Sequence, residues 1–198
     1  MYSHSYLSKD ELEILIKDKI SPFEVNRVLS AYDMADLSYV NKKSLDGSPY
    51  FFHITRICKI LINELEIYES DLLICSLLND ICRNNSEITN EIIEYNFGPY
   101  VTFLLMILKG DYQSINKFKV PQFSDTQKIR IPADDYLIIS LTEHLDNFRS
   151  IVISPAYNPI NYILNTLAIL LPAAENSNNQ YVKKLVCELK KERNKILG

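Results

Sequence analysis

The sequence has few glycines and no long uninterrupted apolar run. Only four of its 198 residues are glycine, the residue that strand turns and bulges most often require. Apolar residues recur three and four positions apart, which is the period of a helix. No apolar run reaches the roughly 18 residues that a membrane-spanning helix needs. We therefore expect an all-α protein without a membrane segment, folded as one domain over 1-198 with its core at about 22-195.

An excess of positive charge and paired cysteines are also missing. The net charge of -4 and the pI near 5.4 give no overall attraction to nucleic acids or anionic membranes. The cysteines form no Cys-x-x-Cys pair, and we expect them to be buried free thiols in a reducing compartment. They are Cys58, Cys75, Cys82 and Cys187. Because no secretory signal opens the sequence, these features predict a cytoplasmic protein that binds neither nucleic acid nor membrane.

Capping residues and helix breakers divide the chain into expected helices. Ser8 is a typical N-cap, and Pro22 is typical of the first turn of a second helix. Expected helices cover about 9-20, 22-40, 53-65, 70-82, 86-98, 101-108, 134-150, 162-174 and 179-195. Residues 111-133 are polar, contain proline and lack a helical period, so they predict a long loop that acts as a lid or a mobile connection.

The expected helix over 70-82 is apolar on most faces, which predicts a central buried position. It nevertheless contains SLLNDICRN, in which Asn79, Asp80 and Arg83 lie close together. A buried amide or carboxylate is costly without a partner. These polar residues therefore indicate either a site or a buried ion pair.

Four segments in fixed order resemble a known family. They are AYDMADLSYVNKKSLDGSPYFFH from Ala31, then LLNDICRN, FGPYV and LTEHLDNFRS. Together they resemble the HD-domain hydrolases of the RelA/SpoT alarmone enzymes and their small single-domain relatives, over about Arg27 to Leu189. GSPYFFH and LDNFR carry most of the resemblance, because each holds several unlike residues at fixed offsets. The resemblance implies an HD-type helical bundle.

In that family a manganese ion is held by two histidines and two aspartates, and its bound water attacks the 3' pyrophosphate of guanosine tetraphosphate. The resemblance places His53, Asn79, Asp80 and Glu143 at the four ligand positions. Asn79 replaces a histidine and can offer a metal only a weak carbonyl oxygen. Glu143 replaces an aspartate, and its extra methylene displaces the carboxylate. The metal site is thus expected to be weak or lost.

The positions that assist catalysis and bind phosphate also differ from the family pattern. Arg83 and Asn84 stand where two acidic residues activate the water. Ser44 and Leu45 replace a basic pair that binds phosphate in the family. Ser140 replaces a lysine on the expected helix that carries Glu143. Including the two ligand changes, seven functional positions are substituted while packing positions keep their character. This pattern indicates lost selection for hydrolysis with retained selection for the fold.

Tyr50, Asn147 and Arg149 match positions that line the family's nucleotide pocket. The resemblance therefore predicts a catalytically degenerate homologue with no cofactor or weakly bound manganese, acting by binding a guanine nucleotide or a protein partner. The alternative is an active manganese-dependent phosphohydrolase that cleaves guanosine tetraphosphate or a related nucleotide. The sequence does not decide whether the chain forms a homo-oligomer.

Plainer interpretations apply to several of these residues. For Asp80, pairing with Arg83 or Arg149 is favoured over metal binding. His144 is expected to be exposed, and Lys42 and Lys43 are expected to lie in a solvated loop, although they could replace the missing basic pair.

Two further segments are candidates for interactions. The aromatic-rich stretch from Tyr95 to Tyr100 is expected to be exposed and could meet a partner. Four basic residues in the long loop could form a local anion site, but charge in an exposed loop more often serves solubility. They are Lys117, Lys119, Lys128 and Arg130.

Overall fold

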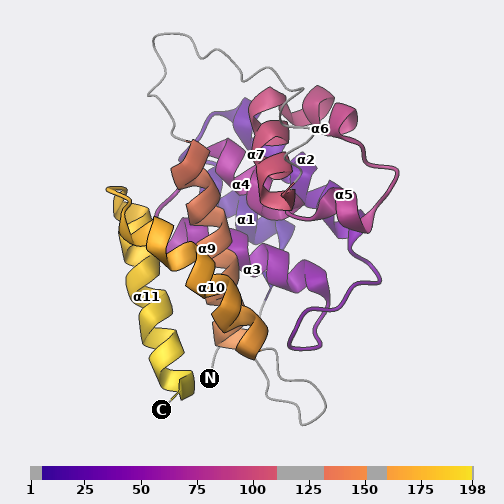
Figure 1. The fold of residues 1–198 in the computed structure, drawn as a ribbon. Coiled ribbons are helices and arrows are strands. Elements are labelled where there is room, and N and C mark those ends of the chain that lie inside the picture. The colour runs from indigo at the N-terminus through magenta and orange to yellow at the C-terminus, as the bar shows by residue number, and fades with distance from the viewer. Residues whose placement is uncertain (1–5, 111–131, 151–159, 198) are drawn as a thin grey trace.

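The structure, a computed structural model, confirms the predicted all-α fold (Figure 1). It describes residues 6-110, 132-150 and 160-197. The helices are α1 (Lys9–Ile16), α2 (Pro22–Ser38), α3 (Tyr50–Asn63), α4 (Ser70–Leu78), α5 (Ile81–Asn84), α6 (Asn90–Phe97), α7 (Pro99–Lys109), α9 (Pro132–Ser150), α10 (Ile160–Glu175) and α11 (Gln180–Leu197). Over the described ranges no residue belongs to a strand, and one isolated bridge pairs Lys43 with Pro49.

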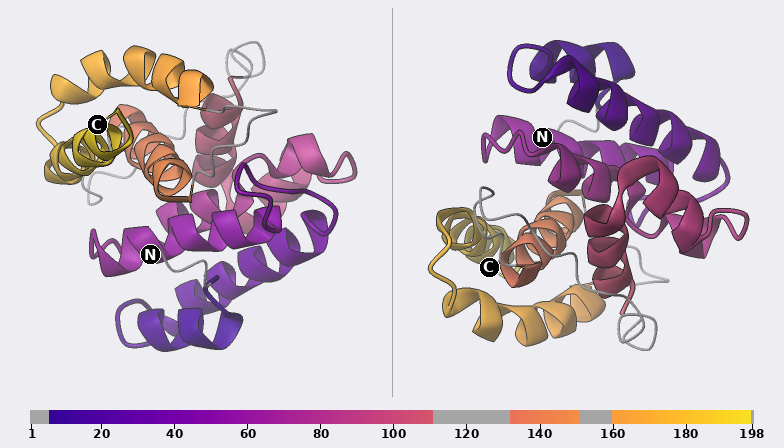
Figure 2. Two further views of the ribbon diagram at one scale, coloured as in Figure 1. Left: turned by 90° about the horizontal axis from the view of Figure 1, so that it is seen from below. Right: turned by 90° about the horizontal axis from the view of Figure 1, so that it is seen from above.

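The helices are arranged in tiers around a central pair (Figure 2). α1 and α2 lie on one side, α3 and α4 in the middle, and α9, α10 and α11 on the other side. α4 contacts α2, α3, α7 and α9, and every residue from Leu72 to Leu78 is buried. The apolar segment is therefore central, as its composition predicts, and burial of its side chains supplies much of the hydrophobic stabilisation.

The first two helices begin where the sequence predicts. Ser8 and Ser21 each accept a hydrogen bond from the backbone N–H three residues on, and the glutamates at those positions return one. Each pair is a capping box that satisfies two free donors at the helix start. Pro22 occupies the first turn of α2. α3 begins at Tyr50, before the expected start at His53, because Pro49 can precede a helix directly.

The expected single helix over 70-82 is wrong, because the chain breaks at Asn79 and Asp80. α4 ends at Leu78, and Asp80 has a φ of 64°, in the left-handed region. Aspartate tolerates this conformation better than most residues. The Asn79 carbonyl accepts a hydrogen bond from the Tyr39 hydroxyl at 2.5 Å instead of continuing the helix. At the break Asn79 stays buried and Asp80 is half-buried.

The expectation of buried cysteines is confirmed for only part of the set. Cys58 and Cys75 are buried as expected, Cys82 is half-buried, and Cys187 is exposed on α11. In the aromatic stretch, Tyr95 is 90% exposed whereas Phe97 and Tyr100 are buried, because the latter two face the core.

Most of the long loop expected over 111-133 lies outside the described residues, which resume at 132, and so do its four basic side chains. Within the described ranges, no helix has the length and apolar character needed to cross a membrane.

Candidate functional site

The predicted ligand positions lie where α3, α9 and the break after α4 come together. His53 is on α3, Asn79 and Asp80 form the break, and Glu143 is on α9. α9 contacts both α3 and α4, so segments 90 residues apart in sequence meet here. The structure thus brings the four positions into one region, as the order of the motifs predicts.

Asn79 and Glu143 are bonded directly to each other. The Asn79 amide nitrogen donates to Oε2 of Glu143 at 3.0 Å. Asn79 is buried, and its backbone carbonyl is fixed by the Tyr39 hydroxyl. The amide therefore holds one oxygen of the carboxylate in place without adding charge. Among the described residues no cation lies within ion-pair distance of Glu143, so its negative charge is not balanced by a direct partner there.

Asp80 is surrounded by donors and cations. Arg83 Nη1 lies 2.9 Å from Asp80 Oδ1, and Lys42 Nζ lies 3.9 Å from Oδ2. The Tyr50 hydroxyl donates to Oδ2 at 3.4 Å, and burial, with the nearby charges of Glu143 and Asp80, raises the pKa of Tyr50, so that it stays a donor. Of the two ion pairs expected for Asp80, the structure forms the one with Arg83.

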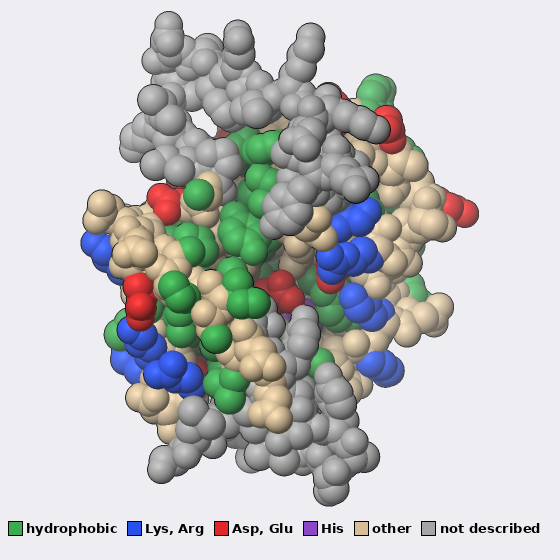
Figure 3. Space-filling view, viewed as in Figure 1, with side chains coloured by type: hydrophobic (Ala, Val, Ile, Leu, Met, Phe, Trp, Pro, Cys, Tyr) green, Lys and Arg blue, Asp and Glu red, His purple; other side chains and the backbone are tan. Residues whose placement is uncertain are grey.

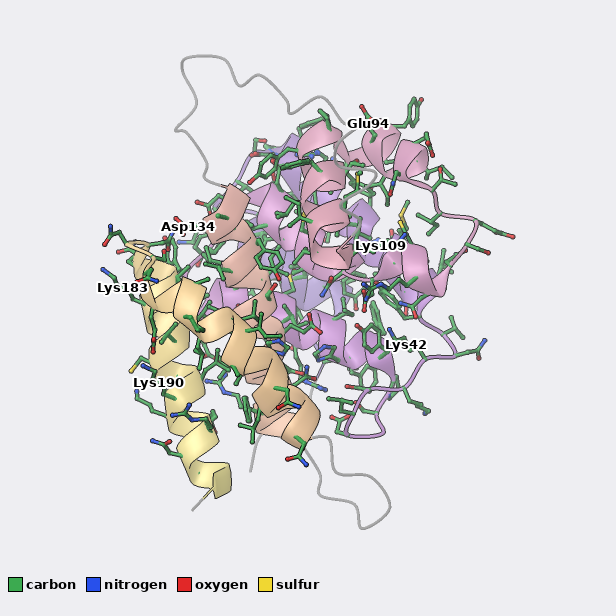
Figure 4. The ribbon with its side chains drawn as sticks, in the orientation of Figure 1. Lys42, Glu94, Lys109, Asp134, Lys183 and Lys190 are labelled. Atoms are coloured by element: carbon green, nitrogen blue, oxygen red, sulfur yellow. The ribbon has the colours of Figure 1, made fainter. Side chains whose placement is uncertain are left out.

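Lys42 does not lie in a solvated loop as expected. The loop before α3 folds back on itself, with the Ser44 N–H donating to the Ser48 carbonyl and the Tyr50 N–H to the Lys42 carbonyl. This places Lys42 beside the start of α3 (Figure 4), with its Nζ 3.6 Å from the centre of the Tyr50 ring. Partial burial lowers the pKa of Lys42, an effect that the charge of Asp80 opposes. Lys43, by contrast, is exposed as expected.

His53 is held by a residue that the sequence motifs do not single out. Its Nδ1 lies 2.7 Å from Oδ2 of Asp146 on α9, and both side chains are fully buried. Arg56, one turn after His53, donates from Nε to Oδ1 of Asp146 at 2.9 Å and from Nη2 to Oδ2 at 3.0 Å. Arg56 also reaches Asp46 at 3.3 Å. This buried network joins α3, α9 and the loop before α3.

The network determines the proton position on His53. Burial alone would raise the pKa of Asp146, but the hydrogen bonds from His53 and Arg56 outweigh it and hold the pKa below its ordinary value. An ionised carboxylate only accepts hydrogen bonds, so Nδ1 of His53 carries the proton toward Asp146. The ring is thus fixed in one orientation by a carboxylate.

A cavity of about 250 Å³ lies next to the break. Its polar residues are Asn79, Asp80, Arg83, Ser140, Glu143 and His144, and its apolar residues are Leu108, Tyr136, Ile169 and Leu170. Figure 3 shows this side of the molecule, where acidic and histidine side chains lie in a hollow bordered by hydrophobic ones. His53 is not among the lining residues described. The cavity is therefore formed mainly by the break, α9 and α10.

His144 is buried, which corrects the expectation of an exposed side chain. Only 6% of it is exposed, because it lies on the inner face of α9 next to Leu145. Desolvation lowers the pKa of His144, although the neighbouring Glu143 opposes this shift. Its Nδ1 has no hydrogen-bond partner within the described part of the chain. Such buried polar atoms are rare in folded proteins.

The three residues predicted to line a nucleotide pocket lie in different surroundings. Tyr50 lies beside Asp80, and Asn147 is buried on α9. Arg149 points to the junction of α3, α9 and α11, where its Nη1 lies 2.5 Å from Glu64 Oε1 and two α11 glutamates lie within 4 Å. It joins three helices and is not among the residues that line the cavity. The nucleotide pocket remains a prediction.

The side chains that the structure describes do not form a metal-binding cluster. Over the described ranges, no group of three or more His, Cys, Asp or Glu side chains is placed to hold a metal ion. His53 is directed to Asp146, Asp80 to Arg83, and Glu143 accepts from Asn79. A firmly bound divalent ion requires deprotonated ligands at bonding distance. The two carboxylates are bonded to Arg83 and Asn79, whereas Nε2 of His53 keeps its lone pair because Nδ1 carries the proton toward Asp146.

Sequence reasoning missed Asp46, Arg56 and Asp146. The family pattern drew attention to the neighbours Glu143, Asn147 and Arg149 instead. A usable signal was present, because Arg56 lies within an otherwise apolar stretch of α3. A buried arginine requires acidic partners, although the sequence could not show which of the 25 acidic residues would supply them.

Comparison with known proteins gives one distant relative. No family model matches the chain. The chain is 23% identical over 192 residues to a rice (Oryza sativa subsp. japonica) protein described as "Putative GTP diphosphokinase RSH1, chloroplastic". The match covers 87% of this chain and 21% of that protein, so the chain spans about a fifth of the length of its relative. Together with the motif order and the all-α fold, this similarity supports a distant relationship of the chain to the RelA/SpoT superfamily.

Proposed function

We propose that the chain is a catalytically degenerate homologue of the HD-domain pyrophosphohydrolases that cleave guanosine tetraphosphate. In this proposal the helical bundle is retained as a binding module, whose ligand is a guanine nucleotide or a protein partner. The distant similarity to a RelA/SpoT-type protein and the all-α fold support the ancestry. The resemblance of GSPYFFH and LDNFR to the hydrolase motifs supports the HD type.

The ion pair between Arg83 and Asp80 carries the proposal. The guanidinium lies 2.9 Å from the one carboxylate that keeps its identity in the metal motif. Its Nη2 also donates to the Lys109 carbonyl at 2.5 Å, at the end of α7. A permanent positive charge thus lies beside the retained carboxylate. Arginine is not deprotonated at physiological pH, so the cation cannot be removed by titration.

Asn84 supports the same conclusion from the other substituted position. Its side-chain nitrogen donates to the backbone carbonyl of Asp80 at 2.7 Å, where the hydrolases carry an acid that activates water. The amide stabilises the break after α4. Neither Arg83 nor Asn84 can act as a general base, because a guanidinium and an amide carry no basic lone pair at neutral pH.

A hydrolysis assay tests the proposal. The full chain is incubated with guanosine tetraphosphate and manganese, and pyrophosphate release is measured over hours. We expect no release above that of an Asp80→Asn variant, which lacks the retained carboxylate. Release that exceeds this control and depends on manganese would support the alternative, an active phosphohydrolase.

Binding of the nucleotide is measured separately by calorimetry. The loss of basic side chains at Ser44, Leu45 and Ser140 removes contacts worth roughly 1.5 to 3 kcal/mol each, so we expect guanosine tetraphosphate to bind weakly. Lys42 lies near these positions but is engaged with Tyr50 and Asp80. A submicromolar dissociation constant would contradict the expected loss of phosphate contacts.

A further inference from the structure

The cavity beside the break differs chemically from a phosphate-binding site. Its charged lining residues, within the described ranges, are Asp80, Arg83 and Glu143. Arg83 and Asp80 form an ion pair at 2.9 Å and balance each other. The carboxylate of Glu143 remains, with only the neutral amide of Asn79 bonded to it among the described residues. The lining itself therefore carries one net negative charge, on Glu143, while Lys42 lies outside the lining at 3.9 Å from Asp80 Oδ2.

A second observation indicates that a hydrogen-bond partner is missing. Nδ1 of His144 is buried without a partner in the described part of the chain, and the residue lines the same cavity. His144 follows Glu143 on α9, so an unpaired nitrogen and a carboxylate border one space. Buried polar atoms are nearly always paired with protein, water or ligand. A ligand with N–H groups would satisfy the Glu143 carboxylate and, in the tautomer that carries the proton on Nε2, this nitrogen as well.

The rest of the described lining is largely apolar. It is formed by Leu108 at the end of α7, Tyr136 on α9, and Ile169 and Leu170 on α10. The volume of about 250 Å³ is slightly below the roughly 300 to 1,000 Å³ typical of sites for drug-sized ligands. The ligand must therefore be small, with an apolar or aromatic body on one side and a donor group on the other.

We propose that this cavity binds a small organic cation, in which an ammonium, amidinium or guanidinium group faces Glu143 and an apolar body lies against Leu170 and Tyr136. A charge-assisted hydrogen bond to a carboxylate is about twice as strong as a neutral one. The inference rests on the proposed function only in that no metal ion occupies the site. It goes further by assigning the cavity a ligand of opposite charge to nucleotide phosphates.

Three matched probes test this assignment. Benzamidine, benzamide and benzoate share one ring and carry a cationic, a neutral and an anionic head group. Each is titrated into the full chain, and amide chemical shifts are followed by two-dimensional NMR. We expect benzamidine to bind at least ten-fold more tightly than benzamide, with shifts at residues on α9 and α10, and benzoate not to shift these residues. Equal binding of the three probes, or tighter binding of benzoate, would overturn the proposal.

Variants identify the groups responsible. Glu143→Gln keeps the size of the side chain and removes its charge, so the preference for benzamidine over benzamide should fall to about two-fold or less. Glu94→Gln, on exposed α6 (Figure 4), removes one acid elsewhere and should leave the preference unchanged. Ile169→Ser should weaken benzamidine and benzamide equally, because it removes part of the apolar wall. Benzamidine binding that Glu143→Gln leaves intact would place the cation at another site and refute the assignment.

The two proposals fail separately. Manganese-dependent hydrolysis of guanosine tetraphosphate would refute the degenerate function whatever the probes show. A chain that neither hydrolyses the nucleotide nor prefers benzamidine would keep the proposed function and lose the assigned ligand class.

Discussion

Nδ1 of His53 lies 2.7 Å from Oδ2 of Asp146, and both side chains are fully buried. The carboxylate that orients this histidine comes from α9, 93 residues later in the chain. Arg56 binds the same carboxylate through two of its nitrogens. His53, which stands at a family ligand position, is therefore part of a buried ionic network that links α3 to α9.

Replacing Asp146 with Asn should destabilise the fold strongly. The change leaves Arg56 with only the Asp46 carboxylate at 3.3 Å among its ion-pair partners in the described ranges, and breaking a buried pair costs about 3 to 5 kcal/mol. Urea unfolding followed by circular dichroism measures the effect. Asp18→Asn, on the exposed turn after α1, is the control and should stay within about 0.5 kcal/mol of the wild type. A loss below 1 kcal/mol for Asp146→Asn would contradict the role of the network.

The same carboxylate predicts a pH dependence. Its pKa in the folded protein is lowered by His53 and Arg56, whereas an aspartate in the unfolded chain has a pKa of about 3.9. The stability that it contributes is therefore complete above the unfolded pKa and is lost as the pH falls through the lower folded pKa. Unfolding free energies measured between pH 7 and pH 3 should fall more steeply for the wild type than for Asp146→Asn. Parallel curves would mean that the pKa of Asp146 is not lowered in the fold.

The Arg83–Asp80 pair should contribute little to stability despite its position. The Arg83 side chain is 50% exposed, and pairs near the surface are worth about 0.2 to 1 kcal/mol. A double-mutant cycle with Arg83→Ala and Asp80→Asn isolates this coupling from the separate bond of Arg83 to the Lys109 carbonyl. We expect the single Arg83→Ala change to be destabilising and to exceed the coupling. A coupling above about 2 kcal/mol would show that the pair is more desolvated than the structure indicates.

Restoring the family residues should restore affinity for metal. Asn79→His adds an imidazole ligand, while Arg83→Glu removes the competing cation and Asn84→Asp adds an acid. The triple variant should bind manganese at least ten-fold more tightly than the wild type, as measured by electron paramagnetic resonance of the free ion. Adding Asp80→Asn to the triple variant should abolish the gain. Stoichiometric manganese in dialysed wild-type protein would instead favour the active enzyme.

The helices were largely predictable because their signals are local. Ser8, Ser21 and Pro22 mark helix starts through contacts within one turn, and the structure has helices beginning at these points. The central position of α4 followed from its apolar composition. The break at Asn79 and Asp80 was not predictable in the same way, because the Tyr39 hydroxyl that binds the Asn79 carbonyl lies on a distant part of the chain.

The candidate site was predictable as a set of positions but not as a set of contacts. The motif order indicated that Asp80 and Glu143 would lie near one another, and Arg83 was a correct choice of partner for Asp80. The burial of His144 and the inward placement of Lys42 were missed. Each depends on how α9 and the loop before α3 pack against other helices, and neither leaves a signal in the neighbouring residues.

The sequence by itself determined the helical content, the central apolar segment and the substitution of the ligand positions. These follow from side-chain chemistry, local period and the order of motifs, all of which act over short stretches of chain. The tertiary structure alone decided which charges meet: Arg83 with Asp80, Asp146 with His53 and Arg56, and Glu143 with only an amide among the described residues. Charge pairing depends on distances in space and on burial, which the packing of α3, α4 and α9 sets.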